Sequence, residues 1–203
     1  MRIAVINEVS ARDKNKLILE ALATATDAEV FNIGMCDTDA PELGLTYIHT
    51  GFMAALALAS GAADFVVGGC GTGQGFLISA MQYPGVYCGL LSDPLDAWLF
   101  SQINGGNCAA LALNKGFGWA GDINLKYIFE KLFSDESGQG YPIHRRESQK
   151  ESRRLLAGVN RAAHKEFPDI INHIDKSMLS AVTAHKSFME FMDQYAKTKI
   201  ILR

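Results

Sequence analysis

Cys70 and the glycines around it are the residues whose types and spacing best support chemistry. The segment GGCGTGQGF, residues 68–76, follows an apolar run at 64–67. Glycine-rich turns after strands are common, because short links need unusual backbone angles, but that does not explain the cysteine. Where such a turn opens into a helix, backbone N–H groups and the helix dipole favour an anion at one point. The same field stabilises a thiolate, so Cys70 can act as a base or nucleophile while the N–H groups hold a developing oxyanion.

Better-known glycine motifs fit this segment poorly. The dinucleotide-binding motif G-x-G-x-x-G usually follows the first strand, whereas this chain has G-x-G-x-G after its third predicted strand. The phosphate loop of nucleoside triphosphatases ends in G-K-[ST], but Phe76 follows Gly75 here. A nucleophile elbow needs G-x-S-x-G, and the segment has no such serine. These motifs therefore do not account for the loop.

The other three cysteines, Cys36, Cys88 and Cys108, lack the surroundings of Cys70. Cys88 and Cys108 lie in apolar strand-like runs and are predicted to be buried thiols, whereas Cys36 is predicted to lie in a loop. No pair has CxxC spacing, and no set of histidines and cysteines has the spacing of a zinc site. The sequence therefore predicts no metal site and no cofactor.

A larger framework must position the glycine loop, and the hydrophobic pattern predicts one. Apolar segments near residues 2–6, 29–34, 64–69, 86–91 and 106–113 predict five strands, separated by segments with helical spacing. Strands that are apolar on both faces form parallel sheets covered by helices on both sides. The expected fold is α/β, a Rossmann-like three-layer α/β/α arrangement with a five-stranded parallel sheet. Ligands of such folds bind at the carboxyl ends of the strands.

Two polar side chains outside the loop are expected at or near that edge of the sheet. Glu8 follows the first predicted strand, and Asn104 precedes the fifth. Residues 92–104 are predicted to form a helix that begins at Ser92 or Asp93, because a proline follows and proline is favoured in the first turn.

From residue 134 onward the sequence changes character. Residues 134–156 are polar and basic, and the part from 170 to 198 carries apolar residues on roughly one helical stripe. The stripe consists of Ile171, Ile174, Met178, Val182, Met189 and Met192. Such a stripe is expected to pack against the domain or a partner subunit, and it is rarely a cofactor site. We therefore expect one domain over residues 1–155 and a C-terminal helical extension over 156–203 that is not an independent domain.

The composition excludes several classes of protein. The 203 residues include 19 basic and 22 acidic side chains, whereas a nucleic-acid-binding protein usually shows a basic excess or stripe. The segment MRIAVINEVS has too short an apolar run for a signal peptide, and the longest apolar stretch is too short and interrupted to span a bilayer. A cytoplasmic protein without nucleic-acid or membrane partners is expected.

The segment Cys70-Gly71-Thr72-Gly73-Gln74-Gly75 resembles the C-G-T-G-x-G signature of the type B ribose-5-phosphate isomerases and the related galactose-6-phosphate isomerase subunits. The segments YIHTGFMAALALASGAADFVVGGC and GVYCGLLSDPLDAWLFSQINGGNCAALAL resemble the elements that flank this signature in the family. The resemblance covers roughly residues 1–155.

This resemblance implies that the chain interconverts an aldose and a ketose, with a small-molecule sugar phosphate as substrate and no metal or cofactor. Cys70 would be the base that moves a proton between neighbouring carbons through a cis-enediolate. Thr72 would hydrogen-bond a sugar oxygen and assist ring opening, and Asn104 would contact sugar hydroxyls. The enediolate oxygens would be held by backbone N–H groups of Gly71, Thr72, Gly73, Gln74 and Gly75.

The resemblance also implies a homodimer or tetramer with its sites at the subunit interface. In the family, basic residues of the partner reach the phosphate. The candidates in this chain are His144, Arg145 and Arg146. The alternative interpretation of this cluster is the solvated start of a helix.

The chain departs from the family pattern around the predicted site. Ile103 stands where the family usually has a histidine that opens the furanose ring. Glu8-Val9 replaces an Asp-His pair, and Gly105 replaces the aspartate that follows Asn104.

Loss of the ring-opening histidine suggests an open-chain substrate. A tetrose or tetrulose 4-phosphate cannot close a furanose, because the hydroxyl that it needs is esterified. Alternatively, His49 or Glu8 has taken over ring opening, although His49 fits a helix-capping role equally well. A second class of function is a sugar-phosphate-binding protein or subunit that has lost catalysis. The missing histidine favours that reading, whereas the intact Cys70 motif favours an isomerase.

Overall fold

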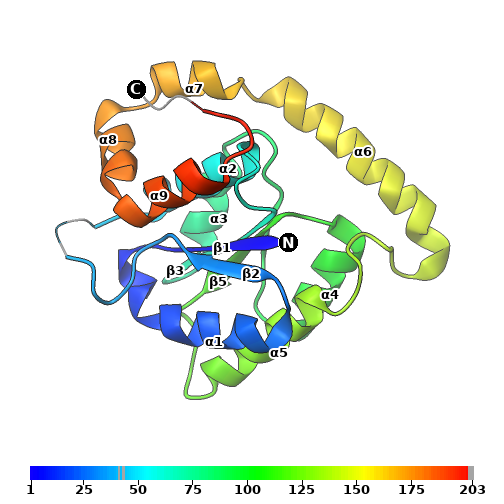
Figure 1. The fold of residues 1–203 in the computed structure, drawn as a ribbon. Helices are drawn as coiled ribbons and strands as arrows, with labels where there is room; N and C mark the ends of the chain where they lie inside the picture. Colours follow the sequence, from blue (N-terminus) through cyan, green and yellow to red (C-terminus); the bar gives the residue numbers. More distant parts are fainter. Residues whose placement is uncertain (41, 43, 201–203) are drawn as a thin grey trace.

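One parallel sheet of five strands forms the centre of the protein (Figure 1). The computed structural model describes residues 1–40, 42 and 44–200. Its strands are β1 (Arg2–Asn7), β2 (Glu29–Asn32), β3 (Phe65–Cys70), β4 (Cys88–Leu90) and β5 (Cys108–Ala112). They lie in the order β2-β1-β3-β5-β4, and each neighbouring pair is parallel. The predicted five-stranded parallel sheet is therefore confirmed.

Helices connect the strands and continue beyond the sheet. Those between and just after the strands are η1 (Val9–Lys14), α1 (Asn15–Ala25), α2 (Tyr47–Ala59), α3 (Gln74–Ala80), α4 (Pro94–Leu99), η3 (Phe100–Asn104) and α5 (Gly121–Phe133). The rest of the chain forms η4 (Ile143–Arg145), α6 (Arg146–Ala163), α7 (Phe167–His173), α8 (Lys176–Ala184) and α9 (Lys186–Tyr195). In the described part of the chain, none of these helices has the length and apolar character needed to cross a membrane.

The side chains of β1 show how the sheet holds a layer on each face. Ile3 and Val5 belong to one buried cluster and Ala4 and Ile6 to another, because successive side chains of a strand point to opposite faces. Helices α1, α4 and α5 pack on the first face, and α2 and α3 pack on the second (Figure 1). The result is the Rossmann-like three-layer α/β/α fold that the sequence predicts.

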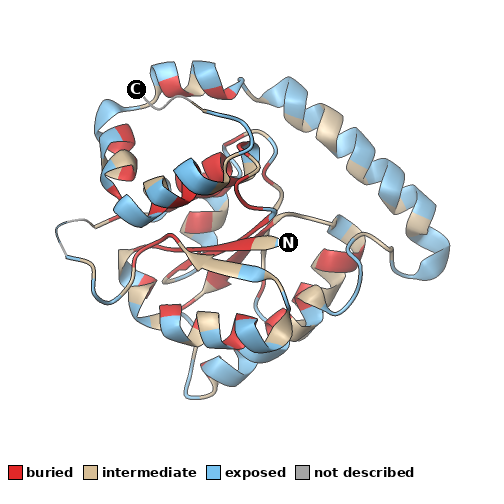
Figure 2. Cartoon of the chain, viewed as in Figure 1, coloured by how far each residue is buried: buried red, intermediate tan, exposed pale blue. Residues whose placement is uncertain are grey.

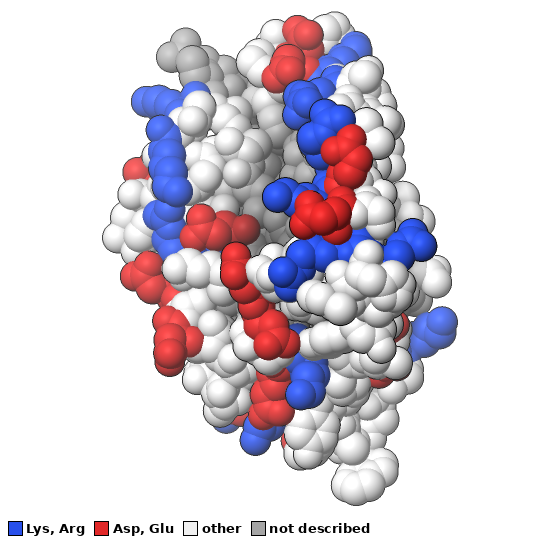
Figure 3. Space-filling view, turned by 90° about the vertical axis from the view of Figure 1, so that its right-hand side faces the viewer, with Lys and Arg blue, Asp and Glu red and all other residues white. Residues whose placement is uncertain are grey.

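Helix α6 runs away from the sheet and exposes most of its surface (Figure 2). None of its residues is buried. Arg153 donates a hydrogen bond to the carbonyl oxygen of Ile103 at 2.8 Å, and Asn160 accepts one from the backbone N–H of Gly85 at 2.8 Å. On the face that carries α6, basic and acidic side chains are interspersed (Figure 3). The predicted boundary between residues 155 and 156 lies inside this helix, which continues to Ala163 without a break.

The predicted apolar stripe over 170–198 is divided among three helices and does not follow one continuous helix. Ile174 and His185 have extended backbones, with ψ of 153° and 102°, and they separate α7, α8 and α9. Asp175 starts α8 by accepting a hydrogen bond from the backbone N–H of Ser177 at 2.8 Å. A capping side chain of this kind begins a new helix. The chain therefore breaks at this cap, although the spacing of its apolar residues fits one continuous helix.

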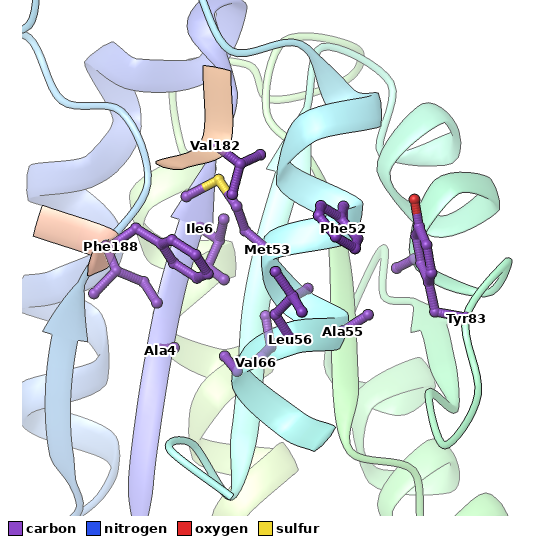
Figure 4. Close-up of a cluster of buried hydrophobic side chains, with 14 of the residues drawn as sticks. Ala4, Ile6, Phe52, Met53, Ala55, Leu56, Val66, Tyr83, Val182 and Phe188 are labelled. Atoms are coloured by element: carbon purple, nitrogen blue, oxygen red, sulfur yellow. The ribbon is translucent and has the colours of Figure 1, made fainter. Parts of the chain in front are cut away.

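The stripe is expected to pack against the domain or a partner subunit, and in the structure it packs against the domain. Four of the six stripe residues are buried in the same cluster as Ala4 and Ile6, namely Ile171, Met178, Val182 and Met192. Figure 4 shows Val182 and Phe188 pointing toward Ile6 and Met53. The extension therefore completes the core on the α2 side of the sheet.

The predicted helix over 92–104 is also divided. Asp93 caps α4 by accepting a hydrogen bond from the backbone N–H of Asp96 at 2.9 Å, so Asp93 is the cap among the two predicted candidates. From Phe100 the chain continues as a wider π-helical turn. The turn ends after Asn104 because Gly105 adopts a left-handed conformation with φ of 55°.

Candidate active site

The glycine loop lies at the carboxyl edge of the sheet, between β3 and α3. Cys70 is the last residue of β3 and pairs in register with Ala112 of β5, while Gly69 pairs with Asn7 of β1. The connection from β1 leads to β2 on one side, whereas β3 leads toward β4 and β5 on the other. The loop therefore stands beside the switch point of the sheet, where doubly wound folds bind their ligands.

Two glycines hold the loop backbone in a space that excludes side chains. A Cβ atom at Gly68 would lie 2.1 Å from Cζ of Phe76, and Phe76 is fully buried. A Cβ atom at Gly73 would lie 2.5 Å from Cδ1 of Leu90. Gly73 also has φ of 73°, which side-chain-bearing residues rarely adopt. The sequence therefore needs glycine at both ends of the Cys70 turn.

The Cys70 side chain sits at the inner end of this loop. It is 6% exposed, and its Sγ atom lies 3.9 Å from Oγ1 of Thr72. The carbonyl oxygen of Cys70 accepts hydrogen bonds from the backbone N–H groups of Leu113 at 3.0 Å and Gly73 at 3.3 Å. A thiol in this position is shielded from bulk water and fixed by the backbone on both sides.

Four of the five predicted backbone donors of the loop have no protein acceptor. Among the described residues, the N–H groups of Gly71, Thr72, Gln74 and Gly75 make no hydrogen bond to backbone or side chain, whereas that of Gly73 is used by Cys70. Two of them belong to the first turn of α3, where N–H groups have no partner within the helix. These donors can bind an oxyanion next to the Cys70 thiol.

The structure brings Glu8 to the same edge, as the sequence predicts. Its backbone N–H donates to the carbonyl oxygen of Gly69 at 3.4 Å, and its side chain is 6% exposed. Ser10 donates a hydrogen bond from Oγ to the Glu8 carboxylate. Within the described residues, the carboxylate therefore has a neutral partner and no basic one.

Two residues that the sequence analysis did not identify, Asn114 and Ser10, lie beside Gly71. A Cβ atom at Gly71 would lie 3.4 Å from Nδ2 of Asn114 and 3.6 Å from Oγ of Ser10. Asn114 Nδ2 also donates to the carbonyl oxygen of Ser10 at 3.0 Å, which joins the loops after β1 and β5. Asn114 directly follows the fifth predicted strand, so the carboxyl-edge rule could have found it.

Tyr47 was also missed by the sequence analysis. Its ring covers Gly75, because a Cβ atom at Gly75 would lie 2.9 Å from Cγ of Tyr47. Tyr47 is the first residue of α2 and is 43% exposed. An exposed tyrosine against a ligand-binding loop can contact a sugar, but no local sequence signal joins positions 47 and 75.

His49 is placed as a capping residue. Its Nδ1 atom accepts a hydrogen bond from the backbone N–H of Thr46 at 3.0 Å and completes a capping box at the start of α2. Burial lowers the pKa of His49 below its usual value, which favours the neutral ring. A direct role of His49 in binding substrate stays a prediction.

Asn104 lies between two cavities, one of which, of about 350 Å³, it lines together with Leu90 and Leu91 after the start of β4. It lines a cavity of about 360 Å³ together with Tyr87, Ile103 and Arg153, next to α6. No hydrogen bond joins Asn104 to the glycine loop within the described residues.

The basic cluster at the start of α6 is likewise separate from the loop. Arg145 Nε donates to Oγ of Ser148 at 3.3 Å, and Arg146 Nε donates to the carbonyl oxygen of Gln139. His144 and Arg145 are exposed. These contacts agree with the alternative interpretation of the cluster as a solvated helix start.

The remaining cysteines and metal ligands offer no competing centre in the described residues. Cys88 and Cys108 are register partners on β4 and β5, but Cys88 is only half-buried, because β4 is an edge strand. Burial and a hydrogen bond with Cys88 raise the pKa of the Cys108 thiol well above its usual value. Residues 1–40, 42 and 44–200 contain no group of three or more His, Cys, Asp or Glu side chains arranged to hold a metal ion.

Residues 3–140 match the family model described as Ribose/Galactose Isomerase. A comparison with curated proteins finds no match. Among solved structures, the chain is similar to a 4-deoxy-L-threo-5-hexosulose-uronate ketol-isomerase complexed with a tartrate. The two chains are 40% identical, with a TM-score of 0.93 over 98% of this chain and 94% of that one.

Two ribose-5-phosphate isomerases are similar to different degrees. One from Vibrio parahaemolyticus is 42% identical, with a TM-score of 0.92 over 98% of this chain and 94% of that one. A type B enzyme from Trypanosoma brucei is 19% identical, with a TM-score of 0.65 over 78% of this chain and 97% of that one. At 19% identity, the similarity to the Trypanosoma brucei enzyme shows a shared fold and nothing more.

Proposed function

The chain belongs to the ribose/galactose isomerase family, and we propose that it interconverts an aldose and a ketose with Cys70 as the general base. The family predicted from residues 70–75 is thereby confirmed. One observation carries the proposal for Cys70: its thiol and the unpartnered N–H groups of the same loop lie together at the carboxyl edge. An aldose–ketose isomerase needs both, because the base creates the negative charge that the donors stabilise.

In the proposed reaction, the Cys70 thiolate removes the proton from the carbon next to the carbonyl group. The C–H electron pair becomes the C=C bond of a cis-enediolate, and the former carbonyl oxygen takes the negative charge. The N–H groups of Thr72, Gln74 and Gly75 stabilise that oxygen. Cys70 then returns the proton to the former carbonyl carbon, and the hydroxyl proton moves to the other oxygen. No atom is gained or lost, and no oxidant or reductant is needed.

The side chains of this chain favour a substrate that is already open. Ile103 cannot exchange a proton, whereas opening a furanose needs a group that can. The hexosulose-uronate named for the 40% identical relative has no hydroxyl at C4 and a carbonyl at C5, so neither carbon can close a ring onto C1. A tetrose 4-phosphate cannot close a furanose either.

We therefore propose an open-chain sugar with an anionic end as the substrate. Of the two compounds, the hexosulose-uronate is the first choice, because the relative described as its ketol-isomerase covers 98% of this chain. Tetrose 4-phosphate is the second, and ribose 5-phosphate, named for the relative from Vibrio parahaemolyticus, is the substrate to compare them with.

We expect kcat/KM for an open-chain substrate to exceed that for ribose 5-phosphate by about 100-fold or more, because the chain lacks the ring-opening acid–base group. The measurement is product formation with each compound, together with incorporation of deuterium from deuterated water at the carbon next to the carbonyl. The variant Ile103→His is the matched control and should improve only ribose 5-phosphate. Efficient use of ribose 5-phosphate without turnover of the open-chain compounds would refute the substrate assignment.

A non-catalytic sugar-binding protein is the alternative that the substitutions at Val9 and Ile103 favour. The same deuterium experiment separates the two functions. An isomerase incorporates deuterium, whereas a binding protein gives measurable affinity with no exchange in any of the three compounds.

We also propose a homodimer. In it, His144, Arg145 and Arg146 of one subunit contact the anionic end of a substrate bound at the glycine loop of the other. Support comes from the exposure of His144 and Arg145, and from the finding that none of the three side chains is hydrogen-bonded to the glycine loop among the described residues. Among the residues that the structure describes, Glu8 has no basic partner within one chain. A twofold arrangement would supply these basic residues to both sites equally.

Mixing two inactive variants tests this arrangement. Subunits carrying Cys70→Ala and subunits carrying Arg145→Ala with Arg146→Ala should be inactive separately. After co-refolding in equal amounts they should recover about a quarter of the wild-type activity, because half of the dimers are mixed and each mixed dimer holds one intact site. Sedimentation as a monomer, or no recovery in proven mixed dimers, would contradict the proposal.

A further inference from the structure

Cys88 and Cys108 form a pair of thiols on the last two strands of the sheet, outside the candidate active site. They are register partners in the parallel pair of β4 and β5, so their side chains point to the same face. Both contact the same buried cluster, and a hydrogen bond joins the two thiols. Both are free cysteines in the structure. The proposed isomerase reaction uses neither of them.

The spacing of the two strands is close to the spacing that a disulfide needs. Neighbouring strands lie about 4.8 Å apart, and the Cα atoms of disulfide-bonded cysteines lie about 4.4–6.8 Å apart. The Cβ atoms must come within about 3.5–4.5 Å of each other, so bond formation needs a movement of about 1 Å or less. Strand β4 can make this movement, because it is a short edge strand and pairs with β5 alone.

Cys88 is the accessible member of the pair. It is half-buried and lines two cavities, of about 360 Å³ and 350 Å³, which can admit a small hydroperoxide. Arg153 is the one Lys, Arg, Asp or Glu side chain among the described residues that line the larger cavity. Hydrogen bonds to the carbonyl oxygens of Ile103 at 2.8 Å and Gly138 at 2.9 Å fix its guanidinium group. A fixed cation favours a thiolate in the same cavity, and the thiolate is the form that attacks a peroxide.

The smaller cavity also holds a carboxylate, that of Asp96. This carboxylate accepts a hydrogen bond from the backbone N–H of Ser92 at 3.0 Å. The backbone donor compensates part of its negative charge. The field of Arg153 in the larger cavity therefore remains the stronger influence on Cys88.

Cys108 is placed to complete the bond after Cys88 has reacted. It is 0% exposed, and burial together with the hydrogen bond from Cys88 raises the pKa of its thiol well above the usual value. The other two cysteines lie too far away to replace it. Val66 of β3 is the register partner of Cys108, and Cys70 lies about 13 Å further along β3. Cys36 follows β2, at the opposite edge of the sheet from β4.

We propose that Cys88 and Cys108 are an oxidation site that a hydroperoxide converts reversibly into a disulfide. The Cys88 thiolate attacks one oxygen of the peroxide, the O–O bond breaks, and Cys88 becomes a sulfenic acid while hydroxide or alkoxide leaves. The sulfur of Cys108 then attacks the sulfur of Cys88, and the departing hydroxyl group takes the Cys108 proton and leaves as water. Two electrons pass from the thiols to the peroxide, and a dithiol reductant returns them.

The disulfide acts on the glycine loop through β4. Leu90 follows Cys88 in the same strand, and its Cδ1 atom lies 2.5 Å from the place where Gly73 would carry a Cβ. Drawing β4 toward β5 therefore changes the packing of Leu90 against Gly73, beside the N–H donors of the loop. Misplacement of a catalytic group by about 1 Å can cost about 100-fold in rate. This effect on activity rests on the proposed isomerase function, whereas formation of the disulfide does not.

The first test identifies the oxidised thiols after exposure of the protein to hydrogen peroxide. The treated protein is denatured and alkylated, and its peptides are analysed by mass spectrometry. Two of the four cysteines should be found in one cross-link between Cys88 and Cys108, and dithiothreitol should release it. The Cys36→Ala, Cys70→Ala double variant is the matched control and should form the same cross-link at the same rate.

Two single variants test the order of the steps. Cys108→Ala should stop at the sulfenic acid of Cys88, which dimedone traps, whereas Cys88→Ala should leave the buried Cys108 reduced. The proposal would be overturned if Cys88 stayed reduced, or if it reached the sulfinic acid while Cys108 remained free. A cross-link that uses Cys36 or Cys70 in place of either thiol would also contradict it.

Activity measurements separate the disulfide from direct oxidation of Cys70. Arsenite reduces sulfenic acids, including that of Cys70, and leaves disulfides intact. After peroxide and arsenite, the wild type should keep about a tenth or less of its kcat/KM on the best open-chain substrate and recover with dithiothreitol. Cys88→Ala should recover with arsenite alone. Full recovery of the wild type while the cross-link persists would refute the effect on the glycine loop. Because the cross-link is detected without turnover, it is tested independently of the isomerase proposal.

Discussion

Replacing Cys70 with alanine should lower kcat by about 100- to 10,000-fold, the usual contribution of a positioned general base. The reason is that Cys70 is the one ionisable side chain within the glycine loop, where the unpartnered N–H groups lie. Deuterium exchange at the carbon next to the carbonyl should disappear together with product formation. Substrate affinity should change little, because the N–H donors and the loop backbone remain in place.

Two matched variants separate loss of the base from loss of structure. Cys36→Ala removes another thiol, half-buried in the loop between β2 and α2, and should keep full activity. Cys70→Ser keeps the size of the side chain but is a far weaker base, so it should resemble Cys70→Ala. Cys70 is a single small side chain at the edge of the core, and its truncation should cost about 1 kcal/mol of unfolding free energy. Retention of exchange by either Cys70 variant would disprove the assigned role.

The alternation of strands and helices made the sheet predictable from sequence. The runs at 2–6 and 64–69 match β1 and β3 to within one residue at each end. The run at 86–91 overestimates β4, which covers only Cys88–Leu90, because the edge strand has a single neighbour to pair with. Periodicity reports which residues are buried, and backbone pairing decides where a strand ends.

The candidate site divides into a local part and a part assembled over long distances. Cys70 and its glycines are contiguous, so one motif identifies them. Tyr47 and Ser10 reach the loop only because α2 and η1 pack beside it, which no spacing rule encodes. Asn114 directly follows a predicted strand, and the rule that located Glu8 would have located it too.

The C-terminal stripe shows a different limit. Its apolar spacing correctly identified buried residues but not the breaks at Ile174 and His185. Those breaks depend on the Asp175 cap and on tertiary contacts. His185, for example, is 5% exposed and lies 3.2 Å from the carbonyl oxygen of Gly34 through its Nε2 atom. A hydrophobic pattern alone does not contain such contacts.

Phe188→Ala should destabilise the whole chain by about 3–5 kcal/mol, the usual cost of emptying a fully buried phenylalanine site. Phe188 lies on α9 and is 0% exposed, and its ring points at Ile6 of β1 and Met53 of α2 (Figure 4). These neighbours belong to the sheet and to its covering helix, so the cavity would open in the core of the domain itself. In a chain of this size the change corresponds to a fall in the midpoint of thermal unfolding of about 6–20 °C.

The measurement is urea unfolding followed by circular dichroism and by tryptophan fluorescence. Leu155→Ala is the matched control, since Leu155 lies on α6 with 56% of its surface exposed and its loss should cost less than about 0.5 kcal/mol. If the extension completes the core, both probes should report one transition, and Phe188→Ala should shift it as a unit. A separate early transition for the C-terminal helices would instead mean that the extension unfolds on its own. In that case the sheet, which carries the Cys70 loop, would not depend on it.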